Sequence, residues 1–300
     1  MYAAISASWS PTQSLITPGA NLFGPVMLAL WLRSFQNIAI FNVTLFLLAL
    51  FLLRKERWDI FIFWILINPL TFPSLLTLNK EILTLFCAVL FFRWLKTRRM
   101  PWYLSSVILS AAVRWEQAFV LLLFLPMMYF RHRRRAVLSL VIMLSVMGPF
   151  LKIAFDSITT GTGQSVVTDT LSRLQGFGLY FAVLPLKLVV MLTSEVVQFW
   201  NVFDDRRLHD LQTGLFVLGH QLCMCALLLL SWYKRLTKLS LDTTYFIVIY
   251  AVIYCAAPLN QPRYFYFIYV LAVLVLSSVG SAAPKLVDRE HEHVRLPGHI

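Results

Sequence analysis

Three cations that stand apart from the basic clusters of this chain could bind an anionic group. Lys80, Arg114 and Arg263 each lie in a short polar motif that interrupts apolar sequence. A charged side chain inside a membrane is costly, so cations kept away from the basic anchors are candidates for function. If the three motifs converge, these cations form one electropositive pocket that can hold a diphosphate group.

Carboxylates accompany two of these cations. Glu81 follows Lys80 at the predicted start of a helix, and a cation at that positive helix end suits an anionic ligand such as a phosphate. Glu116 lies two residues after Arg114 and is followed by Gln117. Arg114 offers a planar donor fork to a phosphate or a sugar hydroxyl, and Glu116 can serve as a base or an orienting carboxylate.

Each motif also has a purely structural interpretation. Asn79 and Glu81 can cap the helix that begins there. Arg114 and Glu116 can take part in an intramembrane ion pair that holds a hairpin to neighbouring helices. Arg263 and Tyr264 precede further aromatic residues, a pattern typical of an interfacial aromatic belt. The residue types alone leave both interpretations open.

Metal and redox chemistry are not indicated. The four cysteines lie in apolar runs without the spacing of a metal or redox site, and we interpret them as packing residues: Cys87, Cys223, Cys225 and Cys255. A second set of candidate ligands surrounds Arg206 and Arg207, which favours a salt-bridged loop: Asp204, Asp205, His209 and Asp210. The sequence therefore predicts no metal and no cofactor.

The composition indicates a membrane protein. Of 300 residues, 59% are hydrophobic and only 13% are charged, whereas soluble domains have roughly 45–50% apolar and about 25% charged residues. The net charge of +12 could suggest nucleic acid, but such a partner needs a solvated basic face. Here the basic residues form brief clusters between apolar runs, so we expect membrane lipids and no nucleic acid as partners.

These basic clusters predict the topology. The positive-inside rule puts all of them in the cytoplasm: Arg54, Lys55 and Arg57; Lys96, Arg98 and Arg99; Arg131, Arg133, Arg134 and Arg135; Lys234, Arg235 and Lys238; and the tail with Lys285, Arg289 and Arg295. An even number of crossings must then separate successive clusters. The apolar runs satisfy this requirement at 34–53, 58–78, 80–95, 101–130, 136–155, 213–232, 243–258 and 265–283.

Two segments need special treatment. Arg114 divides 101–130 into two pieces of about 13 residues, each about 20 Å long, whereas the hydrocarbon layer is about 30 Å thick. The Arg114 apex is therefore either a shallow outer turn in a thinned membrane or the tip of a re-entrant hairpin buried among other helices. Residues 178–203 are interpreted as an outer re-entrant or interfacial helix, because a full crossing would reverse the topology that follows.

The predicted fold is all-α, a polytopic transmembrane helix bundle with about nine crossings and short or re-entrant helices. Residues 1–284 form the transmembrane domain, with an outer loop near 156–177 rich in Gly, Ser and Thr. Residues 285–300 form a short cytoplasmic tail. This topology places the N-terminus outside, which is unusual for a chain without an evident signal peptide, and a missing initial helix would explain it.

Several stretches resemble bacterial surface-polysaccharide assembly proteins, namely Wzy-type repeat-unit polymerases and the wider GT-C glycosyltransferases. The resemblance is spread over most of the chain in short motifs: Asn68-Pro69, Leu78-Asn79-Lys80-Glu81, the Arg114 apex, Pro262-Arg263-Tyr264, and Pro18 to Pro25. It implies a lipid-linked sugar donor, the bacterial inner membrane and chemistry at the periplasmic face. Two features depart from these families. GT-C enzymes usually carry an acidic residue in a large first outer loop, and no such loop follows the first helix here. Wzy polymerases typically have two sizeable Arg-bearing outer loops. Residues 156–177, with Arg173, could be one of them, and residues 201–212 match the second poorly.

The predicted function is glycosyl transfer or polymerisation with a polyprenyl-diphosphate-linked saccharide. Lys80, Arg114 and Arg263 bind the diphosphate, and Glu81 or Glu116 deprotonates the acceptor hydroxyl. Gln117 and Tyr264 complete the predicted substrate-binding set. A lipid-sugar flippase that uses the same cations without chemistry, or a non-catalytic membrane scaffold, remain alternatives, and the sequence does not indicate an oligomeric state.

Overall fold

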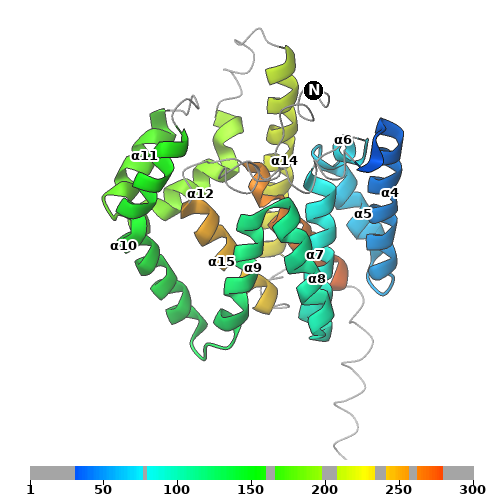
Figure 1. The fold of residues 1–300 in the computed structure, drawn as a ribbon, viewed down its shortest axis with the longest axis horizontal. Coiled ribbons are helices and arrows are strands. Elements are labelled where there is room, and N and C mark those ends of the chain that lie inside the picture. The colour runs from blue at the N-terminus through cyan, green and yellow to red at the C-terminus, as the bar shows by residue number, and fades with distance from the viewer. Residues whose placement is uncertain are drawn as a thin grey trace, which may run out of the picture.

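The structure is a computed structural model that describes residues 31–76, 80–159, 166–197, 208–233, 241–256 and 262–279. Every regular element in these ranges is a helix (Figure 1). They are α4 (Phe35–Leu52), α5 (Trp58–Ile67), α6 (Thr71–Leu76), α7 (Lys80–Thr97), α8 (Met100–Val113), α9 (Trp115–Met128), α10 (Arg133–Thr159), α11 (Val166–Gly176), α12 (Tyr180–Val197), α14 (Leu208–Tyr233), α15 (Leu241–Ala256), the 3₁₀ turn η2 (Pro262–Phe265) and α16 (Tyr266–Val279). The all-α prediction is confirmed.

Local sequence explains several helix ends. Ser34 caps α4 by accepting a hydrogen bond from the Asn37 N–H, at 3.1 Å. Helix α5 ends at Ile67 because Pro69 follows, and the Asn68 side chain accepts the Leu70 N–H at 3.1 Å in the turn that leads to α6. Pro69 thus accounts for the interruption between α5 and α6.

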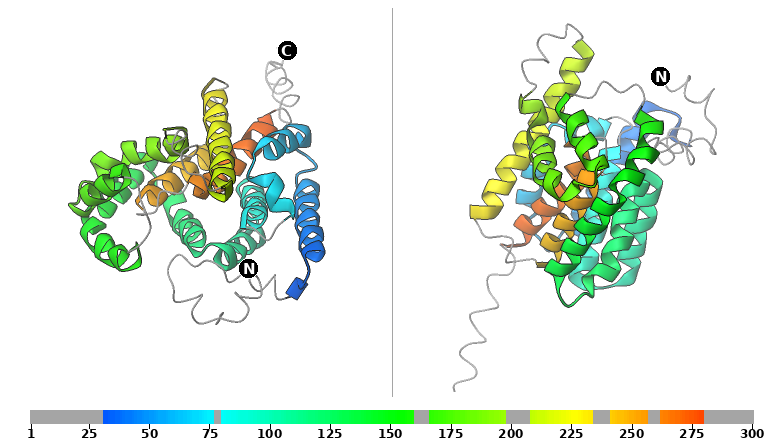
Figure 2. Two further views of the ribbon diagram at one scale, coloured as in Figure 1. Left: turned by 90° about the horizontal axis from the view of Figure 1, so that it is seen from above. Right: turned by 90° about the vertical axis from the view of Figure 1, so that its left-hand side faces the viewer.

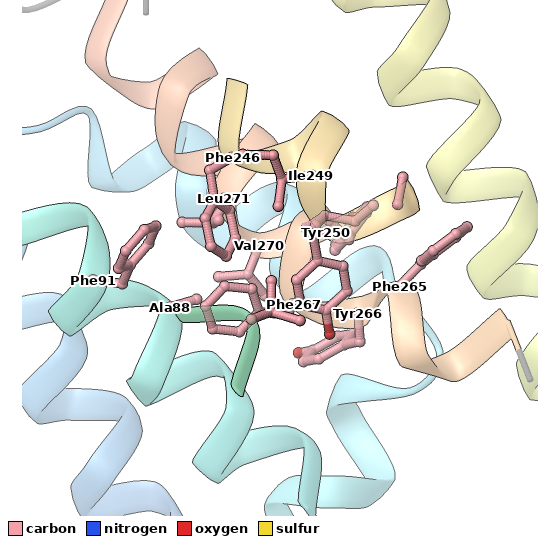
Figure 3. Close-up of a cluster of buried hydrophobic side chains, with 14 of the residues drawn as sticks. Ala88, Phe91, Phe246, Ile249, Tyr250, Phe265, Tyr266, Phe267, Val270 and Leu271 are labelled. Carbon is pink, nitrogen blue, oxygen red and sulfur yellow. The ribbon is translucent and has the colours of Figure 1, made fainter. Parts of the chain in front are cut away.

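The core lies along α16, which is buried on almost every side. A helix that is apolar all round belongs in the interior of a bundle, and α16 packs against α5, α7, α14 and α15. Seen from above, α15 and α16 pass between the α4 flank and the α10–α11 flank (Figure 2). Aromatic side chains from three helices meet there, with the ring of Phe246 4.4 Å from Phe91 and 5.8 Å from Phe267, centroid to centroid (Figure 3).

Ion pairs join the first three basic clusters at one end of the bundle, which we call the basic end. Lys96 donates to Glu56 at 2.6 Å, and Arg98 and Arg133 both bond to Asp242. These contacts link the α4–α5 turn, the end of α7 and the starts of α10 and α15 at the bottom of Figure 1. The predicted topology requires the first three basic clusters to lie at the same end, and these contacts agree with it. The fourth and fifth clusters lie outside the described residues.

The segment predicted as an outer loop near 156–177 contains helical elements in its described residues. Helix α10 continues to Thr159, and α11 carries Arg173 on an exposed position. The polar composition predicts a loop, but α11 buries Leu171 and Gln175 against its neighbours. Its approach to α10 is so close that a Cβ on Gly148 would lie 2.3 Å from the Gln175 carbonyl oxygen. Tertiary packing on a glycine thus stabilises a helix that the composition disfavours.

By length and composition, Leu215–Tyr233 is the single helical stretch in the described part of the chain that could cross a membrane unaided. Helices α8 and α9 have 14 residues each, or about 21 Å at 1.5 Å per residue. Helix α12, predicted as re-entrant or interfacial, is an 18-residue helix packed against α10, α14 and α15. The helical fold class is therefore established, whereas the predicted number of membrane crossings stays a prediction.

Candidate functional site

A buried ion pair joins two of the predicted site residues. Arg114 Nη2 donates to Glu81 Oε1 at 3.3 Å, and the two residues are only 4% and 2% exposed. Glu81 is the second residue of α7, and Arg114 stands between α8 and α9. An ion pair therefore does hold the hairpin to a neighbouring helix, as in the structural interpretation of Arg114. The carboxylate bonded to Arg114 is Glu81, whereas the sequence suggested Glu116 as its companion.

The backbone of Arg114 makes the apex of the hairpin. Its extended conformation, with φ −151° and ψ 97°, separates the two helices. Its N–H donates to the Ser110 carbonyl at 2.6 Å, and its own carbonyl accepts from the N–H groups of Gln117 and Ala118 at 3.0 and 3.2 Å. One residue therefore ends α8 and begins α9. Figure 1 shows the α8–α9 hairpin turning below the tops of α4, α11 and α14.

Tyrosines from α15 and η2 surround the guanidinium. Arg114 Cζ lies 5.0 Å from the centre of the Tyr264 ring, a cation–π contact that is worth about 2 kcal/mol when desolvated. Tyr250 holds the backbone of Tyr264 by donating its hydroxyl to the Tyr264 carbonyl at 3.0 Å. Tyr254 stacks on Tyr250 with ring centres 4.2 Å apart. Arg114 thus lies between a carboxylate and an aromatic wall.

Four buried polar atoms at this site have no hydrogen-bond partner among the described residues. They are Glu81 Oε2, Arg114 Nε, Gln117 Oε1 and the Tyr254 hydroxyl oxygen, while Gln117 Nε2 donates to Ser110 Oγ at 2.9 Å. An unpaired buried polar group costs about 1–3 kcal/mol, so several at one place call for an explanation. A guanidinium N–H, a carboxylate oxygen, an amide oxygen and a phenol hydroxyl are the kinds of group that bind a ligand with hydroxyl groups.

The remaining predicted residues lie around this pair. Lys80 is half-buried at the start of α7, next to Glu81. Glu116 is half-buried on α9, where it and Arg114 both act electrostatically on Tyr254. The Arg263 side chain lies outside the described residues, but its backbone precedes Tyr264 in η2. Adjacent Cα atoms are about 3.8 Å apart, so the three predicted motifs meet at one place.

A second buried polar cluster was missed by the sequence analysis. Asn68 and His220, which is fully buried, form a 2.8 Å hydrogen bond, and Thr71 and Tyr266 form another at 2.8 Å. Because Asn68 Oδ1 accepts the Leu70 N–H, its amide nitrogen faces His220 Nδ1, which assigns the neutral imidazole. The signal was present, since a histidine inside the apolar run 213–232 is itself a functional candidate.

Lys187 belongs to a third buried polar cluster, which joins three helices. It lies on α12, is fully buried and donates to Gln175 Oε1 on α11. Gln175 Nε2 in turn donates to the Ala256 carbonyl at the end of α15, at 2.6 Å. In the sequence, Lys187 interrupts the apolar run 178–203. Its contacts give it a part in holding α11 and α15 to α12.

No metal centre is found within the described ranges, where no three His, Cys, Asp or Glu side chains cluster. Cys87 and Cys255 are buried, Cys223 and Cys225 are half-buried, and all four are free thiols. Asp204 and Asp205 lie outside the described residues. His209 and Asp210 belong to α14, but their side chains do not fall within the described part.

Comparison of the chain with protein-family models, curated proteins and solved structures gives no match. Function must therefore be argued from the residues of the site.

Proposed function

We propose that this chain is a multi-pass protein of the bacterial inner membrane that transfers a glycosyl group from a polyprenyl-diphosphate-linked saccharide to an acceptor saccharide, at the periplasmic face. The observation that carries the proposal is the buried pair of Glu81 and Arg114, with polar atoms left unpaired beside it. The pair lies away from the basic end, so cytoplasmic anchoring does not explain the cation of Arg114. The resemblance to polysaccharide assembly proteins supplies the substrate class.

The outer surface of the bundle supports the membrane setting. Large apolar side chains are exposed along several helices, among them Ile40 and Phe51 on α4, Ile108 on α8 and Val146 on α10. A soluble monomer rarely exposes contiguous apolar patches larger than a few hundred Å². Lipid acyl chains would cover these apolar faces, while the helices satisfy their own backbone hydrogen bonds.

Aromatic residues at the basic end fit a membrane interface. Tyr129 and Phe130 at the end of α9, Trp232 and Tyr233 at the end of α14, and Trp58 at the start of α5 are all exposed. Tyrosine and tryptophan concentrate at headgroup level, and cytoplasmic loops are rich in Lys and Arg. The basic end is then the cytoplasmic end. The α8–α9 hairpin, whose two open ends lie there, enters from the cytoplasmic side and turns its Arg114 apex toward the periplasmic face.

The site residues suit the proposed reaction. The acceptor hydroxyl oxygen attacks the anomeric carbon, the bond from that carbon to the diphosphate oxygen breaks, and Glu116 takes the hydroxyl proton. Arg114 stabilises the negative charge that develops on the leaving diphosphate, with Lys80 and Arg263 as further cations. Glu81 is the counter-ion of Arg114 in the resting protein, which leaves Glu116 as the base.

The test is turnover of a radiolabelled polyprenyl-diphosphate saccharide by the full chain in detergent, with an acceptor saccharide present. Wild type should form product, and Glu116→Gln should lose about 10²–10⁴-fold in rate, the usual contribution of a general base. Arg99→Gln, an exposed charge change at the basic end, should leave the rate unchanged. Donor binding without product from any donor would refute the enzyme and favour a flippase.

A further inference from the structure

A large cavity opens at the basic end, far along the bundle from Arg114. Its volume is about 1080 Å³, and residues from α7, α10, α15 and the end of α16 line it. Ligand sites usually measure roughly 300–1,000 Å³, so this cavity has room for a substantial molecule. None of the predicted site residues lines it.

The cavity carries excess positive charge. Among the described lining residues are Lys96, Arg133 and Arg134, with Asp242 as the one carboxylate. Asp242 is already bonded to Arg133, and Lys96 is held by Glu56 outside the lining. Arg134 is exposed and makes no ion pair with a described residue. The charge of Arg134 is therefore available to an anion in the cavity.

The start of α10 strengthens this preference for an anion. Helix α10 begins at Arg133 with three consecutive arginines and has no acidic residue in its first turn. Cations at the positive end of a helix are unfavourable by about 0.3–1 kcal/mol each. The free N–H groups of that turn and the arginines all favour a negatively charged group at the same place.

The walls of the cavity are apolar. Phe92 and Leu95 from α7, Val137 from α10 and Val248 from α15 line it beside the cations. Lys96 lies 5.0 Å from the centre of the Phe92 ring, and Arg133 lies 5.2 Å from the centre of the Tyr245 ring. Positive charge therefore lies over an apolar lining, an arrangement that matches a molecule with an anionic head and a hydrocarbon chain.

We propose that this cavity binds a membrane phospholipid with an anionic phosphate headgroup, with the phosphate at Arg134 and an acyl chain along Phe92, Val137 and Val248. Basic cavities between helices at the cytoplasmic side suit such headgroups. The site rests on the membrane setting of the proposed function and is separate from its chemistry. A bound lipid would fasten α7, α10 and α15 together where their ends meet.

The experiment is native mass spectrometry of the full chain in detergent, with phosphatidylglycerol and phosphatidylcholine of identical acyl chains in equal amounts. Wild type should retain phosphatidylglycerol preferentially. Arg134→Gln should weaken its retention about five-fold, the equivalent of roughly 1 kcal/mol for one cation near an anionic headgroup, and leave phosphatidylcholine unchanged. Arg131→Gln removes the same charge from the same basic run without touching the lining, and it should retain phosphatidylglycerol as wild type does.

A second variant tests the acyl-chain wall. Val137→Trp fills the apolar side of the cavity without changing its charge, and it should lower retention of both lipids. Equal loss in Arg134→Gln and Arg131→Gln would overturn the proposal in favour of diffuse attraction. Displacement of phosphatidylglycerol by inorganic phosphate at the same concentration would overturn it in favour of free phosphate. Because the readout is lipid retention, a chain that turns over donor but retains no phosphatidylglycerol refutes this site alone.

Discussion

Arg114 and Glu81 are 33 positions apart in the chain, yet their side chains meet at 3.3 Å inside the bundle. The contact joins the apex of the α8–α9 hairpin to the first turn of α7. Both groups are almost completely buried. Charges taken out of water require a partner, so the pair constrains both stability and any chemistry at this site.

Breaking this pair from one side should be strongly destabilising. Arg114→Gln leaves the Glu81 carboxylate buried without its cation, and the loss of a buried partner costs about 3–5 kcal/mol. The double variant Glu81→Gln with Arg114→Gln leaves no charge behind and should recover most of that loss. Thermal unfolding of the purified proteins measures both. Equal destabilisation by the single and double variants would show that the charges are not coupled.

The bond between Asn68 and His220 should stabilise the contact of the α5–α6 turn with α14. Asn68→Ala removes the group that faces the buried imidazole, at a cost of about 1–3 kcal/mol for the polar atom left unpaired. His220→Leu removes the imidazole instead, and adding Asn68→Ala to it should then cost less than Asn68→Ala alone. Denaturant titration of the four proteins gives the coupling, and strictly additive losses would rule the interaction out.

Gly148 should be required for the close packing of α10 on α11. An alanine normally stabilises a helix interior by about 1 kcal/mol relative to glycine. Here its Cβ would meet the Gln175 carbonyl at 2.3 Å, so Gly148→Ala should destabilise by about 1–3 kcal/mol. The melting temperature measures this, with the exposed Ser139→Ala on the same helix as the control. A rise in melting temperature for Gly148→Ala would contradict the packing.

Asp242 should oppose lipid binding in the basic-end cavity while it holds the helices together. Asp242→Asn frees Arg98 and Arg133 from their shared carboxylate and raises the positive charge of the cavity. Of these two arginines only Arg133 is among the residues lining the cavity, so phosphatidylglycerol retention should increase about five-fold, the equivalent of roughly 1 kcal/mol for one cation made available. Mass spectrometry of the variant beside wild type measures the ratio. Unchanged or weaker retention would show that Arg133 does not face the bound headgroup.

The sequence predicts most helices because local signals mark them. Apolar runs separated by basic clusters define α4, α7, α15 and α16, and Pro69 and Arg114 mark the interruptions. The polar composition of 156–177 does not predict helix α11, because α11 packs closely against α10 at Gly148. Nothing in the local composition reports that contact.

The sequence indicates which residues belong to the candidate site but not which of them bond to one another. Lys80, Glu81 and Arg114 stand out as charges in apolar sequence, and their motifs do meet. That Arg114 bonds to Glu81, and that Asn68 reaches His220, depends on helices distant in sequence. Residue types and spacing do not specify such long-range partners, because helix packing decides them.

The most direct test of the proposed chemistry is the transfer rate of the Glu81→Gln, Arg114→Gln double variant with a labelled lipid-linked saccharide. This variant should fold, since no buried charge is left alone, yet it lacks the cation that stabilises the leaving diphosphate. We predict a rate at least about 10²-fold below wild type, as for loss of one transition-state donor, with a melting temperature within a few degrees of wild type. A folded double variant that keeps the wild-type rate would contradict a role for Arg114 in the reaction.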